Sequence, residues 1–100
     1  MRLIERPLGD AMLLEQERRQ DSRGFFARAF CKRELDELGI AVDVAKGNLS
    51  SSPERHTLRG LHLQIGRSSE RKVVQCLKGA IFDVIVDLRP ESPGFRTWCG

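Results

Sequence analysis

Residues 72–88 read KVVQCLKGAIFDVIVDL, two apolar runs on either side of Lys78 and Gly79. Valine, isoleucine and phenylalanine are enriched in β-strands, and a lysine–glycine pair between two such runs suits a tight turn. The stretch therefore predicts an antiparallel hairpin with strands at residues 72–77 and 80–88.

Further strand-like runs and polar loops alternate along the rest of the chain. The runs cover residues 11–15, 24–30, 40–48 and 58–65, and the loops cover 50–54, 66–70 and 89–94. Short strands at this spacing are typical of an all-β sandwich or barrel. KRELDEL at 32–38, followed by Gly39, predicts one short surface helix. Residues 95–100 resemble a strand that is just beginning, so we expect exposed edges that need an oligomer, a swapped partner or a missing C-terminal segment.

Length and composition predict a single domain, residues 1–100, with 40% apolar residues. The longest apolar stretches are far shorter than the roughly 20 residues of a membrane span. The first residues, MRLIER, are charged where a signal peptide needs an apolar core. We therefore expect a cytoplasmic protein that does not associate with a membrane.

The charge pattern argues against general nucleic-acid binding. The 17 basic residues are interleaved with 14 acidic ones, for a net charge of +3. A few arginines directed at one phosphorylated small molecule fit this surplus equally well. Cys31, Cys76 and Cys99 form neither a redox pair nor a zinc pattern, so we expect reduced, mostly buried thiols.

LRGLHLQ at 58–64 holds the first candidate catalytic residue, His62. Strand alternation places His62 and Gln64 on one face, and a histidine that lines a barrel cavity can act as a base near neutral pH. The alternative is a hydrogen-bonded core or surface histidine. The other histidine, His56, falls in a predicted loop, and too few nitrogen ligands remain for a metal site. We expect no metal and no cofactor.

Lys72 is in phase with Val74 and could share this cavity as a cation that stabilises an oxyanion. The alternative is a solvated lysine at a strand end. An inward Asp83 would need a partner such as Lys72 or His62. Arg59 would face away from His62 in a flat strand, unless Gly60 marks a bend.

Arg23 lies in the turn-like sequence DSRGFF at 21–26, from which it could reach a phosphate. The alternative is an ordinary loop arginine. Six motifs now stand in order along nearly the whole chain: DSRGFF at 21–26, NLS at 48–50, LRGLHLQ at 58–64, KVV at 72–74, FDVIVDLR at 82–89 and SPGF at 92–95.

In these motifs the chain resembles the N-terminal part of the dTDP-4-dehydrorhamnose 3,5-epimerase family. The resemblance implies an antiparallel double-stranded β-helix, the cupin-like jelly roll, here incomplete at its C-terminus. It also implies a metal-free homodimer that epimerises a nucleotide-linked 4-keto-6-deoxyhexose, as in rhamnose biosynthesis. A 3,4-ketoisomerase of the broader cupin group is disfavoured, because those enzymes usually carry a second histidine near the position of Gln64.

The resemblance also implies roles for site residues. His62 is the base, Lys72 stabilises the enolate oxygen, and Arg23, Arg59 and Asn48 hold the diphosphate and sugar. Arg28 and Lys46 stand where the best-known members carry glutamate and glutamine, so we expect substrate contacts with an altered nucleotide preference: dTDP, CDP or another.

One departure from the family affects catalysis directly. The family takes its tyrosine acid, and the aspartate that supports the histidine, from a later half, and this chain contains no tyrosine. We therefore expect a truncated form or fragment with little activity of its own. A non-catalytic sugar-nucleotide-binding protein is the alternative.

Overall fold

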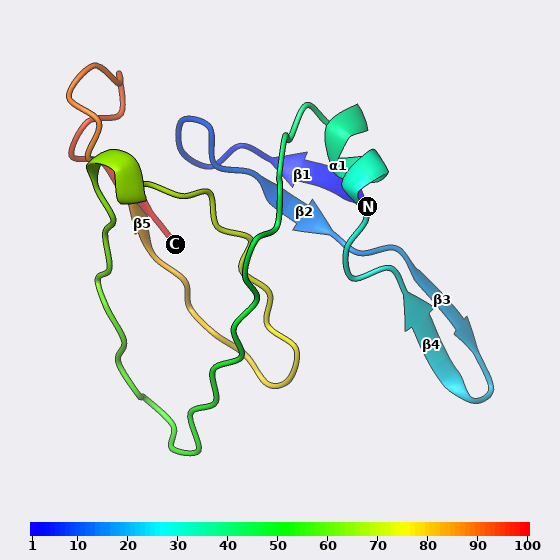
Figure 1. Ribbon diagram of the computed structural model, residues 1–100. Helices are drawn as coiled ribbons and strands as arrows, with labels where there is room; N and C mark the ends of the chain where they lie inside the picture. The colour runs from blue at the N-terminus through cyan, green and yellow to red at the C-terminus, as the bar shows by residue number, and fades with distance from the viewer.

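The computed structural model describes all residues, 1–100. Its strands form three separate two-stranded antiparallel sheets, β1–β2, β3–β4 and β5–β6 (Figure 1). This arrangement, mostly strand with little helix, agrees with the predicted all-β class. The elements in chain order are β1 (Arg2–Glu5), β2 (Leu13–Glu15), β3 (Arg18–Asp21), β4 (Gly24–Ala27), α1 (Lys32–Glu37), the 3-10 helix η1 (Gly66–Ser68), β5 (Ile85–Val86) and β6 (Trp98–Cys99).

The hairpin β3–β4 projects from the body of the chain as an arm (Figure 1). Asp21 pairs with Gly24, so two residues make the turn. The guanidinium carbon of Arg18 lies 4.5 Å from the centroid of the Phe25 ring, a cation–π contact on one face of the arm. Phe26 is paired with Arg19 and is 69% exposed, so both faces of the arm are open to solvent.

Helix α1 is short and ends where the sequence predicts. Gly39 has φ +77°, its N–H donates to the Asp36 carbonyl at 2.9 Å, and Ile40 N–H donates to the Leu35 carbonyl at 2.8 Å. This pair of bonds is the Schellman motif, which glycine completes without a Cβ clash. No helix in the structure is both long and apolar enough to span a membrane.

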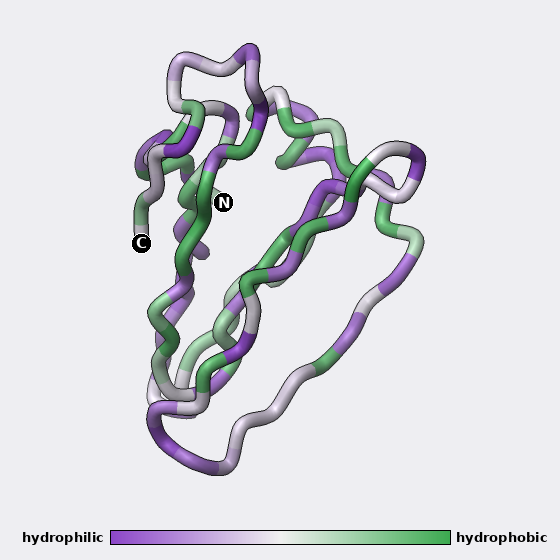
Figure 2. The backbone as a smooth tube through the Cα atoms, turned by 90° about the vertical axis from the view of Figure 1, so that its left-hand side faces the viewer, coloured by the Kyte–Doolittle hydropathy of each residue, from purple (hydrophilic) through white to green (hydrophobic).

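The buried core is very small, because Leu35 and Asp87 are the only two buried residues. The radius of gyration is 15.5 Å, whereas a compact domain of this length has about 13 Å. The backbone forms 25 internal hydrogen bonds, against roughly 65 in a compact domain of this size. Figure 2 shows hydrophobic residues along the extended stretches, and those exposed by more than 70% are Leu49, Leu58, Leu61, Ile65 and Phe82.

Several strand predictions are wrong for this structure. Residues 40–48, 58–65 and 72–77 contain no strand, and within 80–88 only β5 forms. The chain reverses near Gly79, which has φ +83°, but the flanking segments do not pair. Apolar β-formers predict an extended backbone, but a strand also needs a hydrogen-bonded neighbour, and here these segments have none.

Two strands were not predicted, and both are rich in charge. β1 reads RLIE and β3 reads RRQD, with every residue of β3 exposed. Residue composition does not predict such strands, because they are stabilised by pairing with β2 and β4 rather than by a buried face.

Candidate functional site

His62 lies in an extended tract and its side chain is exposed. Gly60, two residues earlier, has φ +96°, a left-handed conformation that interrupts any regular pleat. The bend that would turn Arg59 back toward His62 stays a prediction, because Arg59 bonds to the preceding loop and not to His62. The imidazole has no hydrogen-bond partner within the chain, so its surroundings decide neither for the base nor for a surface histidine.

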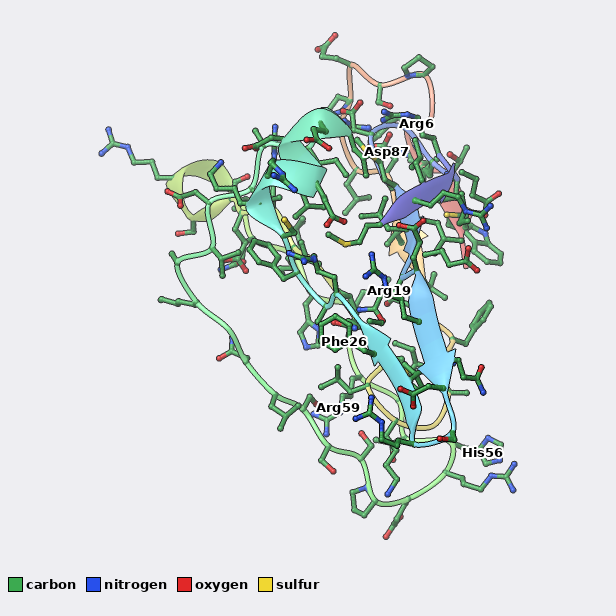
Figure 3. The ribbon with its side chains drawn as sticks, turned by 90° about the vertical axis from the view of Figure 1, so that its right-hand side faces the viewer. Arg6, Arg19, Phe26, His56, Arg59 and Asp87 are labelled. Carbon is green, nitrogen blue, oxygen red and sulfur yellow. The ribbon has the colours of Figure 1, made fainter.

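Arg59 is fixed against the preceding loop. Its Nε donates to Ser52 Oγ at 3.0 Å, and its Nη2 donates to the Ser51 carbonyl at 2.9 Å. These bonds hold the guanidinium on the chain that leads into His62 and leave Nη1 without a partner. Figure 3 shows Arg59 on this tract and His56 projecting outward beyond it.

Lys72 forms one loose ion pair. Its Nζ lies 3.7 Å from Glu70 Oε1, and both side chains are about half exposed, at 49% and 52%. Such pairs in water contribute little to stability. Lys72 can therefore leave Glu70 and bind another anion at a small cost in free energy. Asp83, for which Lys72 or His62 was the expected partner, is exposed and has neither.

Arg23 lies in the turn of the β3–β4 arm. Its backbone N–H donates to Asp21 Oδ1 at 2.8 Å, and its Nη2 donates to Asp21 Oδ2 at 2.7 Å. The side-chain hydrogen bond between them lowers the pKa of Asp21 and raises the pKa of Arg23. Asp21 thus binds the guanidinium through Nε and Nη2, while Nη1 has no hydrogen-bond partner.

Arg28 contacts helix α1 rather than the open face of the arm. Its Nε lies 3.2 Å from Glu34 Oε1, and Glu34 also accepts a hydrogen bond from the Met1 ammonium group at 2.5 Å. This last bond is the main cause of the lowered pKa of Glu34. Lys46 and Asn48 are exposed and their side chains have no hydrogen-bond partner.

No hydrogen bond or ion pair joins any two of the predicted site residues. Each of the paired ones binds a neighbour in its own segment or, for Arg28, the adjacent helix. Two shallow hollows, of about 200 and 380 Å³, are lined by other residues, with Asp10 and Arg89 in both. The assembled catalytic site therefore stays a prediction.

Sequence reasoning missed the most connected polar group of the chain, Asp87. Its carboxylate accepts hydrogen bonds from Arg89 Nε and Nη2, both at 2.9 Å, and from the hydroxyl of Ser92. These bonds, led by those from Arg89, hold the pKa of Asp87 far below its ordinary value. The spacing of an aspartate two residues before an arginine was the available signal. Figure 3 places Asp87 near the top of the molecule and Arg59 well below it, in the lower half.

The cysteines are more exposed than expected. All three cysteines are free thiols, but Cys76 is exposed and Cys31 and Cys99 are partly exposed. The expectation of mostly buried thiols is wrong, because the segments that would cover them do not pack. No group of three or more His, Cys, Asp or Glu side chains is placed to hold a metal ion.

Comparison with known proteins gives one consistent family. The model of the family described as dTDP-4-dehydrorhamnose 3,5-epimerase matches residues 5–100. The relative of that name from Salmonella typhimurium is 40% identical over 101 residues, covering 100% of this chain and 55% of its own length. Relatives of the same name from Methanothermobacter thermautotrophicus and Streptomyces griseus are 38% and 42% identical, covering 99% and 93% of this chain and 52% and 48% of their own lengths. No solved structure matches the chain.

Three antiparallel hairpins with little helix place the chain in the all-β class. Within that class, the match over residues 5–100 shows that it belongs to the dTDP-4-dehydrorhamnose 3,5-epimerase family. The chain spans about half the length of the curated relatives that it matches.

Proposed function

We propose that the chain provides the base and the anion-binding residues of an epimerase that inverts C3, C5 or both in a nucleotide-linked 4-keto-6-deoxyhexose. The observation that carries this proposal is family membership over residues 5–100. The expected setting is deoxysugar biosynthesis, with rhamnose supply for polysaccharides as the leading case.

The chemistry of the proposed reaction needs few groups. A proton on the carbon next to the C4 ketone is acidic, because its loss gives an enolate whose charge rests on the C4 oxygen. His62 removes that proton, and Lys72 stabilises the oxygen as its charge grows. Return of a proton from the opposite face inverts the carbon and restores the ketone.

Substrate binding in this proposal depends on cations. Arg23 and Arg59 each keep Nη1 without a partner, which supports their assignment to the diphosphate. Asn48 is assigned to the sugar, and Arg28 and Lys46 are assigned to the nucleotide end. Arg28 would have to leave or share its ion pair with Glu34 to make that contact.

A non-catalytic sugar-nucleotide-binding protein is the second candidate. The exposed Arg23 and Arg59 fit it as well as they fit the epimerase, because binding a diphosphate needs cations and no base. In this reading the arginines still bind the diphosphate, but no proton leaves the sugar.

The remaining parts of the proposal concern architecture and location. A cupin-like double-stranded β-helix is proposed for the whole family domain, of which the antiparallel hairpins are a part. We also propose a homodimer, as the resemblance implies, and a cytoplasmic location.

The deciding experiment is hydrogen exchange. The purified chain is incubated with dTDP-4-keto-6-deoxyglucose in deuterated water, and the C3 and C5 protons are followed by NMR. His62→Ala is the test variant, and His56→Ala is the matched control because it removes the other histidine. Loss of a sugar proton signal with the parent and the control, but not with His62→Ala, supports the base. Nucleotide binding without exchange supports the second candidate, and neither binding nor exchange contradicts both.

A further inference from the structure

The space beside the His62 imidazole depends on the absence of a side chain at position 60. A Cβ built on Gly60 would lie 3.2 Å from His62 Nδ1 and 3.6 Å from Cε1, as well as 3.4 Å from the His62 backbone nitrogen. The contact to Nδ1 is tighter than ordinary van der Waals contact. Any residue larger than glycine must therefore displace the ring.

The backbone imposes a second, independent requirement for glycine at this position. Gly60 has φ +96°, which L-residues with a Cβ rarely adopt. Gly79 has φ +83°, but a Cβ there would meet nothing within 4 Å. Gly60 thus combines a left-handed backbone with an imidazole next to its Cβ position, whereas Gly79 has only the left-handed backbone.

The contact also sets which edge of the imidazole is covered. Nδ1 and Cε1 are the ring atoms nearest to the Cβ position, so Nε2 is farther than 3.6 Å from it. No hydrogen bond holds the ring, and its Nδ1 edge lies beside the space that a side chain at position 60 would fill.

We propose that Gly60 is a positioning residue for His62: the absence of a side chain at position 60 leaves the space beside the Nδ1 edge of the imidazole free. The effect on catalysis rests on the proposed function, in which His62 is the base. Proton abstraction requires close alignment of the base and the C–H bond, so displacement of the ring slows the reaction without removing the base.

The test uses the chain with ¹³C-labelled histidine. The two histidines give separate ring signals, so His56 is an internal reference for His62. Gly60→Ala should shift the His62 ring signals and leave those of His56 in place. Gly79→Ala, the matched control with the same backbone penalty, should leave both sets unchanged. Equal His62 signals in the parent and in Gly60→Ala overturn the proposal.

Exchange of the sugar protons is measured on the same samples, as a separate readout. Gly60→Ala should slow exchange by about tenfold relative to Gly79→Ala. If the parent shows no exchange, the proposed base function fails, while the ring signals still decide the role of Gly60. If the ring signals shift but exchange is as fast as in Gly79→Ala, Gly60 does not position His62 for the reaction and the proposal is wrong.

A measurement on the parent chain covers the case in which Gly60→Ala does not fold. A nuclear Overhauser contact between a Gly60 Hα and the Hε1 of His62 is expected, because the Cβ position lies 3.6 Å from Cε1. Its presence supports the packed ring. Its absence, with the histidine signals assigned, overturns the proposal.

Discussion

Arg89 Nη1 lies 2.7 Å from Asp10 Oδ2, which joins the turn between β1 and β2 to a residue 79 positions later in the chain. The same guanidinium donates two hydrogen bonds to the buried carboxylate of Asp87. Arg89 therefore connects the first hairpin to the last one, where Asp87 N–H donates to the Thr97 carbonyl at 3.0 Å.

Arg89→Lys should lower the melting temperature, because lysine keeps the charge but cannot form the forked pair with Asp87 while it reaches Asp10. A drop of about 5 °C is expected for a chain of this size. Thermal unfolding followed by circular dichroism checks it. Arg55→Lys, at an exposed arginine without a hydrogen-bond partner, is the control. Equal melting temperatures for the two variants would contradict the bridging role.

Asp87→Asn should make the melting temperature depend less on pH in the acid range. The pKa of Asp87 is lowered in the folded chain, so the carboxylate stabilises the fold fully above the ordinary carboxyl pKa of about 4. That contribution is lost as the pH falls below this value toward the folded-state pKa. Melting temperatures measured from about pH 7 to pH 2 should converge for parent and variant in acid. Asp83→Asn, at an exposed position, should follow the parent throughout. If the melting temperatures of Asp87→Asn and the parent change with pH in parallel, the ionised Asp87 does not stabilise the fold as proposed.

Leu35→Ala tests the apolar part of the small core. Leu35 is 2% exposed, so truncation removes buried contacts and leaves a cavity. The free energy of unfolding should fall by about 3 kcal/mol, measured by urea denaturation. Leu49→Ala, at a leucine that is 83% exposed, should change it little. A large loss for Leu49→Ala would mean that the exposed segments pack in solution.

Gly39→Ala should destabilise helix α1 through its C-terminal end. The positive φ of Gly39 is required by the Schellman motif, and alanine pays a steric penalty there. A loss of about 1 kcal/mol in unfolding free energy is expected. Gly47→Ala, where φ is not positive and a Cβ would meet nothing, is the matched control. No difference between the two variants would contradict the motif.

The pair Arg28 and Glu34 allows a charge-swap test of what Arg28 does. Arg28→Glu should lower the melting temperature by placing two carboxylates together, and Arg28→Glu with Glu34→Arg should recover only part of that loss, because Glu34 also binds the Met1 ammonium group. Nucleotide binding, measured by calorimetry with dTDP, should stay weak in the swapped double variant if Arg28 contacts the substrate. Full recovery of binding would make Arg28 a link between the arm and α1 only.

The sequence alone was sufficient for the family, the all-β class and several local features. The ordered motifs from DSRGFF to SPGF fixed the family resemblance, and the match over residues 5–100 confirms it. Helix α1 and its end at Gly39 were predictable, because propensity and capping are local properties.

Only the tertiary structure decided which extended segments become strands and which charges pair. Residues 58–65 and 72–77 have the composition of strands, yet no partner lies beside them, whereas the charged β3 is a strand because β4 pairs with it. Asp87 rather than Asp83 is buried, because Arg89 and Ser92 fold back onto it. Strand pairing and the burial of a charge both depend on segments distant in sequence or on the path of a loop, and neither is encoded in the residues of one segment alone.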